Sequence, residues 1–109
     1  MSDFGGILIF SKKDGSVFTP EEKQIIINEL ERVIVNGDYP DHIREGNFRR
    51  LIDWGENTLA SMITEYYMDD ETEDLYDFAE EEDMDMLEEM IEQLELPSQI
   101  EVKAAFEEW

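Results

Sequence analysis

The chain has 109 residues, of which 41% are hydrophobic and 11% aromatic, a composition that excludes a disordered chain and predicts one folded domain, residues 1–109. It has no cysteine, which excludes disulfides and a thiolate nucleophile, and no apolar run long enough for a membrane span. The formal net charge of −22 disfavours nucleic acid as a direct partner, because phosphate binding requires Lys and Arg. We expect a cytoplasmic monomer or homodimer that does not contact a membrane.

The first half of the chain predicts a strand followed by a helix. Residues 6–10, GILIF, are apolar on both faces, as in a central strand. A helix is expected after Thr19, with Pro20 in its first turn, Glu22 closing a capping box and Gly37 as the stop signal. The apolar stripe expected on this helix consists of Ile26, Ile27, Leu30, Val33 and Ile34.

The middle of the chain predicts a loop and a hairpin. Residues 36–47 have the Gly, Pro, Asn and Asp content of a loop. Residues 48–54 alternate as a strand, with Phe48, Arg50, Ile52 and Trp54 on one face. Residues 55–57 are expected to form the turn into a second strand, 58–67. In that strand Leu59, Ile63 and Tyr67 are expected on one face, and Ala60, Met62 and Tyr66 on the other.

Residues 69–96 contain fifteen Asp or Glu and no Lys or Arg, yet hydrophobic residues recur among them at helical spacing. Leu75, Phe78 and Ala79 form one apolar stripe, and the stripe of Leu87, Met90, Ile91 and Leu94 is offset by about a quarter turn or more. We therefore expect two helical segments with a kink or a short break near Glu82 and Asp83. Both segments would have their hydrophobic side chains on the sheet, and Asp83 would be the N-cap of the second segment. A last strand is expected after Pro97, with Ile100, Val102, Ala104 and Phe106 facing inward.

The predicted order is strand, helix, strand, strand, helix, strand. This order is typical of the ferredoxin-like fold, an α+β two-layer sandwich (βαββαβ) with an antiparallel sheet and two helices on one face. The other sheet face, at Leu8, Phe10 or the Tyr66 side, would then need a cover from a loop, a dimer partner or a binding protein.

The sequence contains no catalytic, cofactor or metal signature. His42 is the only histidine and the sequence has no cysteine, so His42 has no such residue with which to form a metal or catalytic motif. No calcium-loop, Walker or Rossmann pattern is present. With 30 acids, a pair of carboxylates at a glycosidase-like separation would occur by chance. We expect no enzyme activity, no cofactor and no bound metal.

Almost all of the excess charge lies in the second half of the chain. Residues 1–54 contain 10 acids and 7 bases, whereas residues 55–109 contain 20 acids and 1 base. In size, acidity and lack of cysteine the chain resembles bacterial immunity proteins that neutralise a toxin, and proteins that mimic nucleic acid.

The charge distribution predicts a binding domain whose acidic helical face binds a basic protein, such as a nuclease-type toxin. The alternative is a ligand-sensing or regulatory ferredoxin-like domain whose acids only keep it soluble. The residues expected to bind the partner are Tyr67, Asp69, Asp70, Glu73, Asp74, Tyr76, Asp77, Glu81, Asp85, Glu88 and Glu92.

Overall fold

In the computed structural model, which describes residues 3–67 and 75–109, the first strand is the centre of an antiparallel sheet. The elements in chain order are β1 (Asp3–Lys12), α1 (Pro20–Val35), α2 (Asp41–Arg44), β2 (Leu51–Gly55), β3 (Thr58–Met62), β4 (Tyr66–Tyr67), α3 (Tyr76–Gln93) and β5 (Ile100–Glu108). The described part of the chain is thus a small α+β domain with five strands and three helices. The expected βαββαβ order is not confirmed, because one expected strand is divided and α2 lies in the expected loop.

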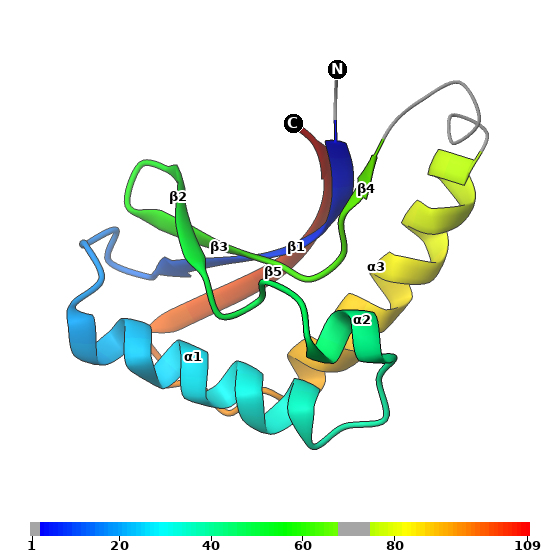
Figure 1. The fold of residues 1–109 in the computed structure, drawn as a ribbon. Helices are drawn as coiled ribbons and strands as arrows, with labels where there is room; N and C mark the ends of the chain where they lie inside the picture. Colours follow the sequence, from blue (N-terminus) through cyan, green and yellow to red (C-terminus); the bar gives the residue numbers. More distant parts are fainter. Residues whose placement is uncertain (1–2, 68–74) are drawn as a thin grey trace.

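The strand pairing is organised around the two edges of β1. β5 pairs with β1 along one edge, from Phe4 opposite Glu108 to Lys12 opposite Ile100. β3 and β4 therefore share the other edge of β1. β3 pairs with Ile7 to Phe10 of β1, and β4 pairs with the first residues of β1. β2 pairs with the outer side of β3. Figure 1 shows β1 and β5 curving together through the sheet, with α1 and α3 on the outside of the curve.

The expected strand 58–67 is interrupted between β3 and β4. There the backbone N–H groups of Ile63 and Thr64 both donate to the carbonyl oxygen of Gly6, at 3.0 and 3.2 Å. A Cβ atom on Gly5 would overlap the carbonyl oxygen of Thr64, so this approach requires glycine. The interruption also turns the Tyr66 ring onto Phe4, 5.2 Å between centroids, on the helix side of the sheet. The prediction that Tyr66 shares a face with Ala60 was therefore wrong.

The strand expected at 48–54 begins later than predicted, at Leu51. Phe48 is fully buried in the helix-side core but lies before the strand, and its carbonyl oxygen accepts a hydrogen bond from Ser61 at 2.6 Å. Ile52 and Trp54 pack on the opposite face of the sheet. The alternation from Phe48 to Trp54 therefore does not place these three side chains together.

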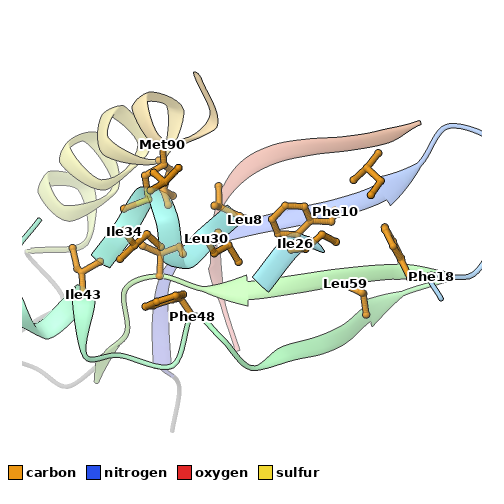
Figure 2. Packing of buried hydrophobic residues seen from close by; sticks show 14 residues of the cluster. Leu8, Phe10, Phe18, Ile26, Leu30, Ile34, Ile43, Phe48, Leu59 and Met90 are labelled. Atoms are coloured by element: carbon orange, nitrogen blue, oxygen red, sulfur yellow. The ribbon is translucent and has the colours of Figure 1, made fainter. Parts of the chain in front are cut away.

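Helix α1 forms as its local sequence predicts. Thr19 caps it, Pro20 is its first residue, and Thr19 and Glu22 make both hydrogen bonds of the capping box. Its buried side chains Ile26, Leu30, Val33 and Ile34 pack on the sheet, and Figure 2 shows Leu30 beside Leu8 and Ile26 beside Phe10.

Leu8 and Phe10 face the helices and not the uncovered side of the sheet, which corrects the expectation made for them. The residues on the opposite face are Ile7, Ile9 and Ala60, and each is at most 8% exposed although none of the described helices covers them. The curvature of the sheet brings Trp54 and Trp109 together over this face, with their rings in edge-to-face contact at 6.4 Å. The sheet thus covers most of this face with its own side chains.

Helix α3 is continuous from Tyr76 to Gln93, without the expected kink near Glu82. Leu87 and Met90 are fully buried against the sheet and α1, with Ile91 packed beside them. Because the helix does not kink, Leu75 and Phe78 do not reach the core, and they remain 54% and 63% exposed. None of the described helices has the length and apolar character to cross a lipid bilayer.

The arginines make ion pairs mainly within the first half of the chain. Arg49 pairs with Glu31 at 2.8 Å and Arg44 with Asp41 at 3.3 Å. Arg32 is the link to the end of α3, since it pairs with Glu29 and also donates to the carbonyl oxygen of Gln93 at 2.6 Å. Among residues 3–67 and 75–109, none of these ion pairs includes an acid of α3.

The continuity of α3 is tested by two substitutions. Leu87→Ala should reduce the free energy of unfolding by about 2–5 kcal/mol, because it leaves a cavity in the core. Phe78→Ala should cost less than about 1 kcal/mol, because this ring is mainly in solvent. Urea denaturation of both variants measures the two values. Similar large losses would mean that Phe78 is a core residue and that the helix kinks as first expected.

Glu22 makes stability depend on pH in the acid range. The backbone N–H of Thr19 and then the ammonium of Lys12 hydrogen-bond its carboxylate and lower its pKa from 4.5 to about 2. A lowered folded-state pKa stabilises the fold above pH 4.5, and this contribution is lost as the pH falls toward 2. The stability difference between wild type and Glu22→Gln, from urea denaturation, should shrink over this range. Glu21→Gln is the matched control, and a difference independent of pH for Glu22→Gln would contradict the assignment.

Candidate protein-binding surface

The exposed acids of α3 form a line on the side of the helix that faces away from the sheet. Asp77, Glu81, Asp85, Glu88 and Glu92 are exposed and lie three or four residues apart, so at 100° per residue they follow one side of the helix. The buried residues Asp83, Leu87 and Met90 lie on the opposite side. We call these five exposed acids the acidic stripe.

The acidic stripe is not neutralised within the described part of the chain. Glu80, Glu82 and Glu89 are also exposed and widen it on both sides. No Lys or Arg among residues 3–67 and 75–109 comes within ion-pair distance of an acid on α3. The nearest such pair involves Glu95, after the helix, 3.9 Å from Arg32.

Tyr76, one of the expected partner-binding residues, is half-buried. Its ring lies 5.0 Å from that of Phe4 and 5.2 Å from that of Phe106. Burial raises the pKa of its hydroxyl, and the negative charges of Glu80, Glu108 and Glu107 raise it further. The negative potential therefore extends from α3 to the end of β5.

Glu107 and Glu108 were not among the residues expected to bind the partner. The predicted site contained only residues of segment 67–92, and these two acids lie outside it, on β5. The excess of acids over bases in residues 55–109 was the sequence feature that could have placed Glu107 and Glu108 in the predicted site.

The remaining predicted residues are separated in the structure. Tyr67 lies on β4, a different element from the acidic stripe, and about half of its side chain is exposed. Asp69, Asp70, Glu73 and Asp74 fall outside the described residues, so their role stays a prediction.

Asp83 has a structural role that differs from the expected N-cap. It lies in the middle of α3 and is only 8% exposed. Its Oδ2 accepts hydrogen bonds from the hydroxyls of Thr64, at 2.8 Å, and Tyr66, at 2.9 Å. The Thr64 Oγ1 in turn accepts from the backbone N–H of Gly6 at 2.8 Å. This chain of hydrogen bonds, which we call the Asp83 junction, fixes α3 against the interrupted edge of β1.

The Asp83 junction also determines which way the acids of α3 point. With Asp83 and Leu87 fixed against the sheet, the helical period places Glu81, Asp85 and Glu88 on the outside. Burial raises the pKa of Tyr66 to about 12, and the hydrogen bond to Asp83 contributes to this rise. The Tyr66 hydroxyl therefore remains a donor over the physiological pH range.

Two hollows border the acidic stripe. One, of about 410 Å³, lies between α3 and β5 and is lined by Glu80, Glu81, Met84, Asp85 and Phe106. The other, of about 250 Å³, lies at the start of α3 beside β4. The surface thus combines negative charge with recesses that expose some apolar area.

The described residues do not form a metal-binding cluster. No group of three or more His, Asp or Glu side chains in residues 3–67 and 75–109 is placed to hold a metal ion. His42 is exposed on α2. The chemistry available at the acidic stripe is recognition of positive charge.

Comparison of the chain with protein-family models, with curated proteins and with solved structures gives no match. The functional argument therefore depends on the geometry and charge of this surface.

The Asp83 junction is tested by a pair of substitutions at Thr64. Thr64→Val removes the hydroxyl and leaves the buried N–H of Gly6 without its acceptor, so the free energy of unfolding should fall by about 1–3 kcal/mol. Thr64→Ser retains the hydroxyl and should lose less than about 1 kcal/mol. Chemical denaturation compares the two variants, and equal losses would show that the hydroxyl does not stabilise the junction.

Proposed function

We propose that this chain is a non-enzymatic binding domain whose acidic stripe binds a basic protein. The observation that carries the proposal is that α3 exposes eight carboxylates with no ion-pair partner in the described structure. Like charges three or four residues apart on a helix destabilise it by a few tenths of a kcal/mol per pair. Cations of a partner would remove this repulsion, and the uneven charge would accelerate their encounter.

The partner that best fits this surface is a protein with a cluster of Lys and Arg. A nuclease-type toxin is one such protein, because its phosphate-binding site is positively charged. The proposed role is then that of an immunity protein or inhibitor that occupies this site. Support comes from the concentration of charge in residues 55–109, which solubility alone does not require, since a net charge of about 2 to 8 keeps a small domain soluble.

We further propose that the fold is ferredoxin-like. This assignment requires β3 and β4 to be treated as one interrupted strand and α2 as an insertion. The assignment is supported by the position of β2 outside β3, of β5 on the far edge of β1, and of α1 and α3 on one face.

A ligand-sensing or regulatory domain is the second candidate. The observation in its favour is the mainly apolar hollow of about 250 Å³ beside β4, a recess large enough for a small molecule. In that case the acids of α3 would only keep the protein soluble, and removing them would not change binding.

The stripe proposal is tested with two variants that each remove four negative charges. The stripe variant carries Glu81→Gln, Asp85→Asn, Glu88→Gln and Glu92→Gln. The control variant carries Glu21→Gln, Asp38→Asn, Glu45→Gln and Glu56→Gln, at exposed positions elsewhere. Exposed ion pairs contribute about 0.2–1 kcal/mol each, so the stripe variant should bind a short oligolysine peptide roughly tenfold more weakly, and the control variant should bind like wild type.

The measurement is calorimetric titration of the peptide at several salt concentrations. Wild-type affinity should fall as salt rises, and the stripe variant should show a flatter dependence. Equal weakening in both variants would mean that net charge alone is responsible and would refute a specific surface.

The class of partner is tested by affinity capture from the source cells with the same three proteins. Wild type and the control variant should retain one Lys- and Arg-rich protein that the stripe variant does not retain. Capture of that protein by all three would contradict the role of the acidic stripe.

A further inference from the structure

The hollow beside β4 combines aromatic walls with two carboxylates. It is lined by residues of β1, of β4 and of the first turns of α3. Its volume is about 250 Å³ and most of its accessible lining is apolar. The lining residues are Phe4, Tyr66, Leu75, Phe78, Ala79, Glu82 and Asp83.

Two exposed hydrophobic residues at the start of α3 line this hollow. Leu75 and Phe78, expected in the core, are 54% and 63% exposed and form its outer wall. Exposing a leucine and a phenylalanine next to each other is unfavourable in water, and such contiguous apolar surface is typical of a binding site. The inner wall is the ring pair of Phe4 and Tyr66.

Asp83 lines the hollow, and the hydrogen bonds of the described residues leave one of its carboxylate oxygens without a donor. The residue is 8% exposed, and its Oδ2 accepts the hydrogen bonds of Thr64 and Tyr66. Its Oδ1 accepts none from the described residues. Every fully buried side-chain oxygen in the described part of the chain has a hydrogen-bond partner, so Oδ1, which has none there, must be accessible from the surface. Asp83 lines the hollow, which is therefore the recess through which Oδ1 can be reached.

Glu82 adds a second carboxylate at the same hollow. Both Asp83 and Glu82 line the recess beside the Tyr66 hydroxyl, whose pKa is raised mainly by burial and further by these two carboxylates. No Lys or Arg in residues 3–67 and 75–109 pairs with either carboxylate. The hollow therefore has an apolar body and an unbalanced negative end.

The side chain that matches this chemistry is arginine. A guanidinium is planar, stacks on aromatic rings and donates in a fork to a carboxylate, whereas the ammonium of lysine is a more strongly hydrated point charge. The methylene stem of arginine would contact Leu75 and Ala79 while its head reaches Asp83 and Glu82.

We propose that this hollow is an anchor pocket for one arginine side chain of the basic partner. The inference rests on the proposed function, since the basic protein supplies the arginine, and it adds a specific contact to the charge attraction of the acidic stripe. The aromatic and aliphatic walls orient the side chain, and the two carboxylates select for its charge.

The test is an NMR titration of the intact chain with Nα-acetyl-arginine methylamide. Amide shifts should move at Phe78, Ala79 and Glu82, next to the hollow. The neutral citrulline analogue should bind roughly tenfold more weakly, because it retains the shape but loses the charge-assisted hydrogen bonds. Equal binding of the two compounds, shifts confined to the acidic stripe, or no shift with arginine would each overturn the proposal.

Matched variants separate the pocket from general electrostatics. Phe78→Ala and Glu82→Gln should each weaken binding of the arginine compound, whereas Phe78→Tyr and Glu89→Gln should preserve it. All three positions are exposed, so the four variants should retain the fold, and the dispersion of the NMR spectrum verifies this. Unchanged affinity in Phe78→Ala and Glu82→Gln would refute the pocket.

The two proposals fail separately. The oligolysine peptide reports on the acidic stripe and contains no arginine, and the arginine compound reports on the hollow. Loss of arginine binding with peptide binding intact would refute only the pocket. A stripe variant that binds peptide like wild type, with arginine binding intact, would refute only the function of the stripe.

Discussion

The fold and its charged surface both depend on the buried carboxylate of Asp83. It is the one acid of α3 that the described structure places against the sheet, where it meets Thr64 and Tyr66. A buried carboxylate is costly unless hydrogen bonds compensate for lost water, and here two hydroxyls donate to one oxygen. Because Thr64 is also held by Gly6, the junction connects α3 directly to the central strand.

This junction explains features that otherwise look unrelated. Thr64 reaches Asp83 only because the strand edge is interrupted there, and the interruption requires the close approach of Gly5 and Gly6. A Cβ atom on Gly6 would lie 2.8 Å from the Leu87 side chain, so the helix also packs closely on β1 at this point. With one side of α3 fixed in this way, the other acids have only the solvent side to occupy.

The sequence predicted well what depends on neighbouring residues. Helix α1 begins at Pro20 because Thr19 and Glu22 make local hydrogen bonds, and the turn after Gly55 follows from Asn57, which adopts a positive φ of 58°. The inner alternation of β5 was likewise recognisable. These signals act over a few residues, so a single sequence contains them in full.

The features that were not predicted depend on contacts between distant residues. Asp83 sits in a run of acids that would normally be solvated, and its partners are 17 and 19 residues away in the chain. Residues 6–10 are apolar on both faces, so their pattern did not show that Leu8 and Phe10 face the helices. Leu75 and Phe78 were assigned to the core because hydrophobic side chains usually lie there, yet a straight helix turns them outward. The quarter-turn offset between the two apolar stripes was a signal for this, and it was attributed to a kink.

Amide hydrogen exchange along α3 tests the central claim most directly, namely that the Asp83 junction fixes one straight helix with the acids outside. The account predicts uninterrupted protection through the middle of Tyr76–Gln93, strongest around Asp83 and Leu87. It also predicts that Thr64→Val lowers protection in the first half of α3 more than in the second. Two protected segments separated by fast exchange at Glu82 and Asp83 would contradict it, because the helix would then be broken where the structure anchors it.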